Sequence, residues 1–168
     1  MTVGEVLRRA SGYLEERGVE NPRLDAELLL GKALGRSRLD LYLEHDRRLN
    51  ETELASCREL VERRGKREPL AYVLGEWGFR RLTIKVDRRV LVPRPETEVV
   101  AGRALELLEG LDRPRVLDLG TGSGAIALAI ADEHPGARVT GVDSSADALA
   151  VARENAERLG LEDRKSVV

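Results

Sequence analysis

The stretch from Val116 to Ala125, Val-Leu-Asp-Leu-Gly-Thr-Gly-Ser-Gly-Ala, holds the residues whose types and spacing could do chemistry. Three alternating glycines, Gly120, Gly122 and Gly124, predict a tight turn between a buried parallel strand and a helix. Such a turn lets a ligand approach the backbone closely, and the helix that follows presents unpaired N–H groups to it. The spacing therefore favours a ligand site over a strand-to-helix turn that binds nothing.

Two flanking segments must position this turn. Val116, Leu117 and Leu119 are expected to be buried in the strand before it, and residues 125–131 begin the helix after it. Asp143 ends the next apolar run. A carboxylate at the tip of a second strand is placed to accept both hydroxyl groups of an adenosine ribose. Together the segments predict a Rossmann-like nucleoside site.

Asp118 distinguishes between two kinds of cofactor. The spacing of Gly120, Gly122 and Ala125 also fits the dinucleotide pattern G-x-G-x-x-G/A, so the glycines leave the choice open. A carboxylate at the mouth of the turn would repel a pyrophosphate by roughly 1 kcal/mol or more. S-adenosyl-L-methionine has no phosphate, and its ammonium and sulfonium groups would be attracted. The sequence therefore favours S-adenosylmethionine over a nicotinamide or flavin cofactor. The residues predicted to bind it are Asp118, Gly120, Thr121, Gly122, Ser123, Gly124 and Asp143.

The composition of the 168 residues excludes several classes of function. The 28 basic and 30 acidic residues leave a net charge of −2, which argues against a general polyanion-binding surface. The single cysteine, Cys57, rules out an intramolecular disulfide, and its spacing from Leu54 and Val61 predicts a buried position. His45 and His134 lack further ligands at metal-binding spacing, so no metal site is predicted. No apolar run approaches the roughly 18 residues of a membrane span, and we expect a cytoplasmic protein without a membrane partner.

The first 70 or so residues are predicted to form a helical unit. Its four helices begin at capping signals, which are Thr2 with Glu5, Asn21 with Pro22, Ser37 with Asp40, and Asn50 with Glu53. The second helix is expected to bury one broad face made of Leu24, Leu28, Leu29 and Leu30. Two interpretations stay open: ordinary amphipathic helices, or a recognition domain for a macromolecular substrate.

The sequence pattern changes between Pro69 and Pro93, where it predicts a β-hairpin that turns at Arg80-Arg81 and is followed by the apolar run 90–92. Pro93-Arg94-Pro95 then fixes an extended approach to another helix. This segment is either a rigid helix start or a clamp over the ligand, with Arg94 or Thr97 pointing inward.

Several segments together resemble one family. They are Asn21 to Leu29, Glu68 to Tyr72 with Gly75, Leu91 to Glu98, Asp118 to Leu128, and Val142 to Leu149 with Ala152, Asn155 and Ala156. The family is the HemK/PrmC type of protein-glutamine methyltransferase, which modifies class I peptide-chain release factors. Many methyltransferases share the glycine motif, whereas the Pro-Arg-Pro-Glu-Thr-Glu segment is much more specific to this family.

The resemblance implies an N-terminal helical bundle, a β-hairpin linker and a seven-stranded methyltransferase domain. For this chain we expect an α/β fold in which the Rossmann-like class I methyltransferase domain is incomplete. The corresponding domains would be a substrate-recognition domain over residues 1–74, the linker over 75–92 and the partial S-adenosylmethionine-binding domain over 93–168. Residues 120–124 would line the methionine and ribose side of the cofactor, with Asp143 holding the ribose. The reaction implied is methylation of the glutamine side-chain amide in the Gly-Gly-Gln motif of a release factor.

One family motif is not found in this sequence. The resemblance implies an Asn-Pro-Pro-Tyr loop that accepts the amide hydrogens of the glutamine and orients its nitrogen. The only Asn-Pro here is Asn21-Pro22, so no catalytic residue is assigned. Only two parallel strands are expected, which would leave an edge and apolar faces uncovered. We therefore expect a truncated form that is inactive alone and either marginally stable or paired with another copy.

Two other functions stay open. An adenine-specific nucleic-acid methyltransferase would use a similar acceptor loop, but the neutral N-terminal segment argues against a nucleic-acid partner. A non-catalytic fragment that binds a partner through its helical domain is the second alternative.

Overall fold

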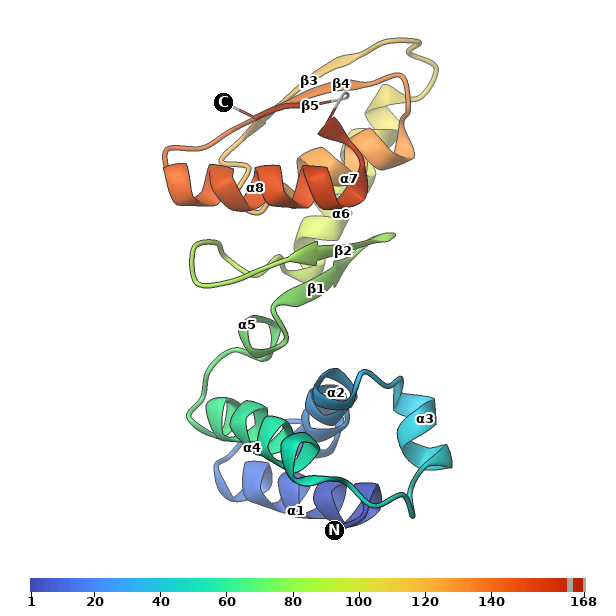
Figure 1. Ribbon diagram of the computed structural model, residues 1–168. Helices are drawn as coiled ribbons and strands as arrows, with labels where there is room; N and C mark the ends of the chain where they lie inside the picture. The colour runs from blue at the N-terminus through green and yellow to red at the C-terminus, as the bar shows by residue number, and fades with distance from the viewer. Residues whose placement is uncertain (163–164, 168) are drawn as a thin grey trace. The chain divides into compact units, whose positions relative to one another are not determined.

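The computed structural model describes residues 1–162 and 165–167, and the chain forms two compact units, Met1–Leu74 and Gly75–Val168 (Figure 1). The first unit is helical, and the second contains both sheets.

Five helices make up the first unit. They are α1 (Val3–Glu16), α2 (Pro22–Leu34), α3 (Arg38–Leu43), α4 (Glu51–Gly65) and α5 (Leu70–Leu74). Helix α2 packs against α1 and α4, and apolar side chains from all three share one core. Cys57 lies in that core as predicted, and burial raises the pKa of its thiol to about 11. The thiol is therefore protonated near neutral pH.

The local capping signals of this unit are largely confirmed. Thr2, Ser37 and Asn50 each form a complete capping box with the acidic residue three positions later. At α2, Asn21 occupies the N-cap position and Pro22 begins the helix as predicted, although the Asn21 side chain makes no capping hydrogen bond. The expected burial of Leu24 was wrong. Leu24 is 40% exposed because the buried face of α2 instead continues through the polar residues Asp25 and Glu27.

The second unit begins with an antiparallel hairpin and continues as an α/β layer. Its elements are β1 (Glu76–Phe79), β2 (Leu82–Lys85), α6 (Pro95–Leu108), β3 (Arg115–Leu119), α7 (Ala125–Glu133), β4 (Arg138–Val142), α8 (Ala146–Leu159) and β5 (Lys165–Val167). The hairpin turns at Arg80 and Arg81 as predicted, but residues 90–92 form no strand. Strands β3, β4 and β5 form a parallel sheet in that order, so the sheet has three strands where two were expected.

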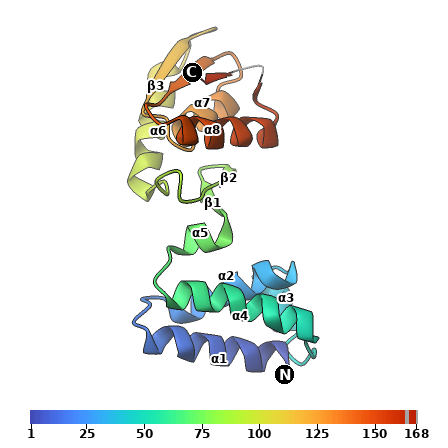
Figure 2. The same ribbon diagram turned by 60° about the vertical axis from the view of Figure 1, so that its left-hand side comes forward.

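Helices α7 and α8 lie on the same side of this sheet (Figure 2). Val139 of β4 is buried in the core that α7 forms there, with Val116 of β3 packed against it. The prediction that Leu117 and Leu119 are buried was wrong, since they are 59% and 74% exposed. Successive side chains of a strand point to opposite faces, and these two belong to the face away from α7. Their burial would require a second layer, which the described residues do not form.

The hairpin turn is fastened to the helices of the second unit through Arg80. Its backbone adopts a left-handed conformation with φ of 51°, and its N–H donates to a carboxylate oxygen of Glu98 on α6. Its guanidinium binds both carboxylate oxygens of Glu133 on α7, which lowers the pKa of that carboxyl. One residue therefore joins the turn to two helices.

Candidate functional site

The predicted glycine turn connects β3 to α7. Gly120, Gly122 and Gly124 all have positive φ, at 75°, 55° and 80°. The backbone N–H groups of Gly120 and Thr121 both donate to the carbonyl of Val142, at 2.8 and 2.9 Å. Glycine is the residue that adopts these angles without steric cost, which explains why the sequence alternates it here. The turn is thereby held against the end of the neighbouring strand.

The outer side of the turn is open. A Cβ atom built on Gly120 or Gly122 would meet no atom within 4 Å. Gly120 is exposed and Gly122 is half-buried. A ligand can therefore approach the backbone at these two positions.

Asp143 lies directly beyond β4 and faces the turn. Its Oδ2 accepts the N–H of Gly122 at 2.9 Å, and its Oδ1 accepts the N–H of Ser145 at 2.9 Å. These backbone hydrogen bonds, from Ser145 first and then Gly122, lower the pKa of the Asp143 carboxyl. A carboxylate offers about four acceptor positions, so about two stay available for hydroxyl groups of a ligand.

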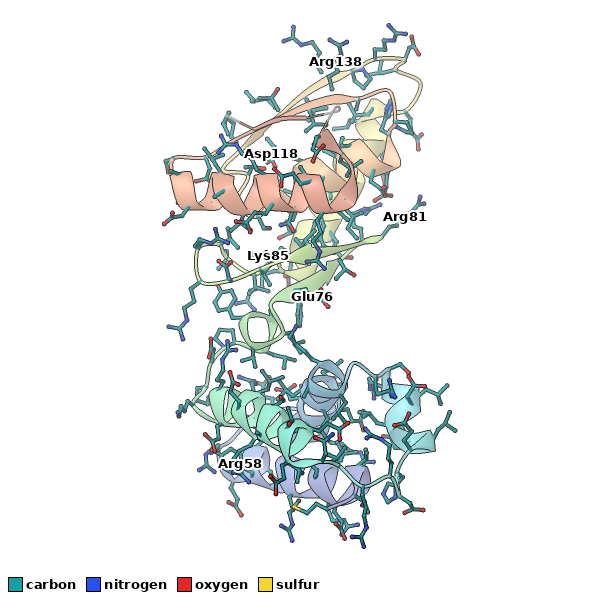
Figure 3. All side chains as sticks on the ribbon, in the orientation of Figure 1. Arg58, Glu76, Arg81, Lys85, Asp118 and Arg138 are labelled. Carbon is teal, nitrogen blue, oxygen red and sulfur yellow. The ribbon has the colours of Figure 1, made fainter. Side chains whose placement is uncertain are left out.

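Asp118 and Thr121 form a second contact inside the turn. The hydroxyl of Thr121 donates to Oδ2 of Asp118 at 2.8 Å, and Thr121 is buried. Figure 3 labels Asp118 in the second unit. Thr121 also lies against Gly141 of β4, where an added Cβ would come within 2.8 Å of its hydroxyl oxygen. The side chain of Thr121 is thus enclosed by the turn and the neighbouring strand.

Asn155 is a site residue whose role the sequence analysis missed. Its fully buried side chain donates to the carbonyl of Ser123 in the turn, at 2.9 Å. It also accepts from the N–H of Lys85 at 2.6 Å and donates to the Lys85 carbonyl at 3.0 Å. The signal was available, because Asn155 shares the apolar face of α8 with Val151 and Ala152. A polar residue on a buried face requires hydrogen-bond partners.

Ion pairs between the hairpin segment and α8 surround that contact. The carboxylate of Glu154 pairs with Lys85 and Arg89, which lowers its pKa. Arg89 also binds Asp87 and lowers the pKa of that carboxyl to about 2. A further pair joins Arg158 of α8 to Glu76 of β1 at 2.8 Å. The hairpin is thus fixed to the helix that follows Asp143.

Arg94 and Thr97 lie at the start of α6. Their positions fit both a rigid helix start and a clamp over the ligand. Arg94 occupies the N-cap position, is exposed, and makes no side-chain capping bond. The backbone N–H of Thr97 donates to the Arg94 carbonyl at 2.9 Å. Whether Arg94 or Thr97 contacts a ligand stays a prediction.

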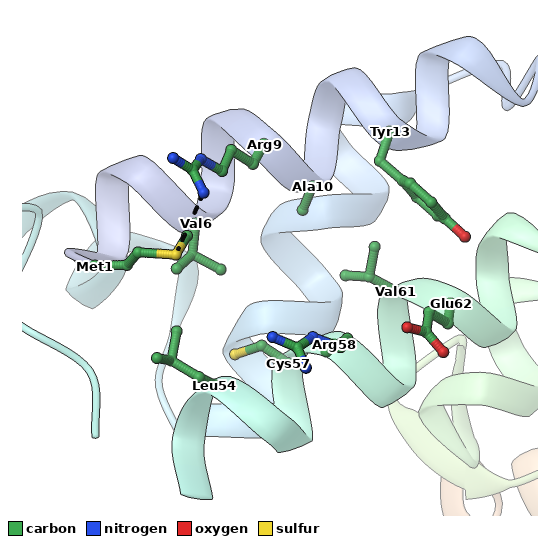
Figure 4. A pocket seen from close by; sticks show the side chains of 10 residues that line it. All are labelled: Met1, Val6, Arg9, Ala10, Tyr13, Leu54, Cys57, Arg58, Val61 and Glu62. Carbon is green, nitrogen blue, oxygen red and sulfur yellow. Dashed lines mark hydrogen bonds between the residues drawn. The ribbon is translucent and has the colours of Figure 1, made fainter. Parts of the chain in front are cut away.

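The first unit contains an apolar groove and a more polar hollow. An apolar groove of about 310 Å³ lies between α1 and α4, over Val6, Ala10 and Val61. Figure 4 shows Arg9 projecting from α1 and Arg58 from α4 at this groove. Within residues 1–162, neither guanidinium lies within 4 Å of a carboxylate oxygen, and Arg9 donates a hydrogen bond to the Met1 sulfur.

A second hollow of about 380 Å³ is more polar and includes Arg8, Arg23 and His45. Beside it, the buried carboxylate of Glu27 accepts from Arg23, Arg38 and Tyr42. These hydrogen bonds lower the pKa of Glu27 against the opposing effect of burial.

Two kinds of feature are not seen in the part of the chain that the structure describes. No three His, Cys, Asp or Glu side chains come together in a way that could hold a metal ion. Nor does any of the described helices have the length and apolar character that crossing a bilayer requires.

Two family models match this chain, and the first match ends close to where the first structural unit ends. Residues 5–75 match the PrmC N-terminal domain, and residues 112–167 match a methyltransferase domain. The glycine turn and Asp143 lie within the second match.

Proteins from two bacteria match nearly the whole chain. A release factor glutamine methyltransferase of Geobacter sulfurreducens is 50% identical over 159 residues, which cover 95% of this chain and 55% of that protein. The protein with the same description from Chlorobaculum tepidum is 46% identical over 168 residues, covering 97% of this chain and 57% of its own length. The chain thus spans a little over half the length of these relatives.

Among solved structures, an S-adenosylmethionine-dependent methyltransferase from Geobacter sulfurreducens, in complex with S-adenosyl-L-homocysteine, is 39% identical. The match covers 45% of this chain and 28% of that one, with a TM-score of 0.36.

Proposed function

Because the chain carries a PrmC N-terminal domain followed by a methyltransferase domain, we propose that it serves in methylating the glutamine side-chain amide of class I peptide-chain release factors, with S-adenosylmethionine as methyl donor. The relatives that match nearly all of this chain are described as release factor glutamine methyltransferases. Release factors act on cytoplasmic ribosomes, so the proposed reaction takes place in the cytoplasm.

The observation that carries the cofactor proposal is the open glycine turn joined to Asp143. Gly120 and Gly122 leave the backbone accessible, and the carboxylate beside them is fixed by two backbone N–H groups. The lowered pKa keeps Asp143 ionised at neutral pH. An ionised carboxylate with acceptor positions to spare suits the two ribose hydroxyls of S-adenosylmethionine.

Asp118 supports S-adenosylmethionine over a dinucleotide. Its carboxylate is held at the turn by Thr121, so a pyrophosphate bound there would lie near a fixed negative charge. The ammonium and sulfonium groups of S-adenosylmethionine gain from the same charge. Thr121 and Ser123 have buried side chains, so we propose that they contribute to cofactor binding through their backbone and through the shape of the turn.

The first unit is proposed to contact the release factor. The groove between α1 and α4 combines an apolar floor with two guanidinium groups, of Arg9 and Arg58, and one carboxylate, of Glu62. Its lining is therefore basic on balance. Such a surface suits an apolar segment that carries acidic residues. Residues 1–74 would then be the recognition domain, residues 75–92 the linker and residues 93–168 the cofactor-binding part.

Calorimetric titration with S-adenosylhomocysteine, with NADH as the control ligand, tests the cofactor proposal. The expected result is binding of S-adenosylhomocysteine alone, lost in Asp143→Ala. Asp147→Ala is the matched control, because it removes an exposed carboxylate from the first turn of α8 without touching Gly122. Binding of NADH in preference would overturn the proposal.

Titration of the 168-residue chain with a class I release factor tests the partner. Binding is expected to weaken at least tenfold in the double variant Arg9→Glu, Arg58→Glu, whereas affinity for S-adenosylhomocysteine stays unchanged. We expect no methyl transfer from these 168 residues, since the acceptor motif of the family is not among them. Turnover would contradict that expectation. Salt-sensitive binding of DNA or RNA, with none of the release factor, would favour the nucleic-acid alternative.

A further inference from the structure

Asn155 joins two parts of the second unit that are far apart in sequence. Its side chain is 0% exposed and forms three hydrogen bonds, all to backbone groups. Two of them go to Lys85 at the end of the hairpin, and one goes to Ser123 in the glycine turn. A single side chain thus connects the glycine turn to the end of the hairpin.

The amide group of Asn155 fits this position in a way that no other side chain of its size does. Its Nδ2 has two hydrogens, and both are used, on the carbonyls of Lys85 and Ser123. Its Oδ1 accepts the N–H of Lys85. An aspartate would put an acceptor where two carbonyls require a donor, and a leucine would leave all three groups without a partner.

The Asn155 amide makes the hydrogen bonds to Lys85 that a neighbouring strand would otherwise make. Strand β2 pairs with β1 along one edge, and Lys85 turns its N–H and C=O toward Asn155 on α8. The contact with Ser123 fixes the peptide group that joins Ser123 to Gly124, inside the turn. Movement of the hairpin end and movement of the turn are therefore mechanically linked.

We propose that Asn155 is a positioning residue for the cofactor: it holds the glycine turn in its binding shape and couples that shape to the hairpin. This inference rests on the proposed binding of S-adenosylmethionine at the turn. It makes the hairpin part of the cofactor site, although hairpin residues need not touch the ligand. Cofactor binding should then stabilise the hairpin end, and loss of the amide should weaken cofactor binding.

Calorimetry with S-adenosylhomocysteine tests the first consequence. Asn155→Asp keeps the size of the side chain and removes its donors, and Asn155→Ala removes the whole amide. Both are expected to bind at least tenfold more weakly than the wild type. The matched control is Arg158→Ala, which breaks another contact between α8 and the hairpin and leaves Ser123 untouched. The control is expected to bind within twofold of the wild type.

Amide hydrogen exchange on the wild-type chain tests the coupling between the turn and the hairpin without any variant. The test can therefore be made even if the substitutions prevent folding. Saturation with S-adenosylhomocysteine is expected to slow exchange of the Lys85 N–H at least fivefold, and the N–H of Phe79, in the same hairpin, serves as reference. A purely structural Asn155 would leave Lys85 exchange insensitive to the ligand.

The outcomes separate the two proposals. Slower Lys85 exchange together with weakened binding in Asn155→Asp supports the positioning role. If the wild type binds S-adenosylhomocysteine but Lys85 exchange is unchanged, the positioning role is overturned and the proposed function stands. The same holds if the wild type binds and the Asn155 variants bind as tightly as Arg158→Ala. A wild-type chain that does not bind S-adenosylhomocysteine overturns both.

Discussion

The backbone N–H of Gly122 donates to Oδ2 of Asp143 across 2.9 Å, which joins the turn after β3 to the turn after β4. The two residues are 21 positions apart in the chain. The contact gives one carboxylate two tasks, because the group proposed to hold the ribose also fixes the backbone of the turn. Loss of its charge should therefore affect both binding and the fold.

Asp143→Asn tests these tasks together. The amide oxygen can keep one of the two backbone hydrogen bonds, while its NH₂ group faces the other N–H. The expected cost is about 1 kcal/mol in the free energy of unfolding, with at least a tenfold loss of affinity for S-adenosylhomocysteine. Urea unfolding and calorimetry measure the two. Asp147→Asn, the same charge change at an exposed position, should leave affinity unaltered; equal losses in both variants would contradict the assignment.

Gly141→Ala should disturb the turn from the strand beside it. The added Cβ would lie 2.8 Å from the Thr121 hydroxyl oxygen and 3.1 Å from its Cβ, so Thr121 must move. Overpacking of this kind costs about 1–3 kcal/mol. Displacing Thr121 would also break its hydrogen bond to Asp118.

The matched control for that substitution is Gly78→Ala in β1, where an added Cβ meets nothing within 4 Å. Thermal unfolding of the two variants provides the comparison. If Gly141→Ala is as stable as Gly78→Ala, the close approach of Thr121 to Gly141 does not limit the stability of the chain.

Arg80→Ala is expected to lower the free energy of unfolding by about 1–3 kcal/mol, because a carboxylate that is mostly buried loses its main partner. The side chain of Glu133 is 9% exposed, and its other basic neighbour, Arg81, is 3.7 Å away. Arg81 itself is 75% exposed, so Arg81→Ala should cost less than about 0.5 kcal/mol. Denaturant unfolding that ranks the two variants the other way would refute the role given to Arg80.

Asp87 should make the hairpin segment sensitive to acid. Its pKa is lowered from 3.8 to about 2 in the folded chain, chiefly by hydrogen bonds from Arg89. A lowered pKa stabilises the fold above the unfolded-state value near pH 4, and the contribution is lost as the pH falls toward 2. The difference in unfolding free energy between the wild type and Asp87→Asn should therefore shrink between pH 6 and pH 2.5.

Asp112 serves as the control for this titration, since its side chain is 98% exposed. Asp112→Asn should follow the wild type across the whole range. A difference between the wild type and Asp87→Asn that stays constant with pH would contradict the ion pair as the source of stability.

Features set by neighbours in sequence could be predicted before the structure was known. The capping boxes of Thr2, Ser37 and Asn50 each need only a residue three positions away, and all three formed. The turn of glycines followed from backbone angles that other residues adopt at a cost. Placing Asp143 beyond the second strand needed only the periodicity of one strand.

Features set by distant residues could not be predicted in the same way. Leu117 and Leu119 looked buried because apolar strand residues usually are, but burial depends on a second layer over the sheet. The role of Asn155 depends on partners 32 and 70 positions away. Its apolar surroundings on α8 indicated that it needed partners without identifying them.

The exposed side chains of Leu117 and Leu119 have a practical consequence for work at the bench. They stand on β3, which pairs with β4 along one edge, and the described residues place no strand along its other edge. Exposed apolar side chains beside unpaired backbone N–H and C=O groups promote association between chains. We therefore expect self-association to rise with protein concentration, and binding is best measured on dilute samples with a mild detergent.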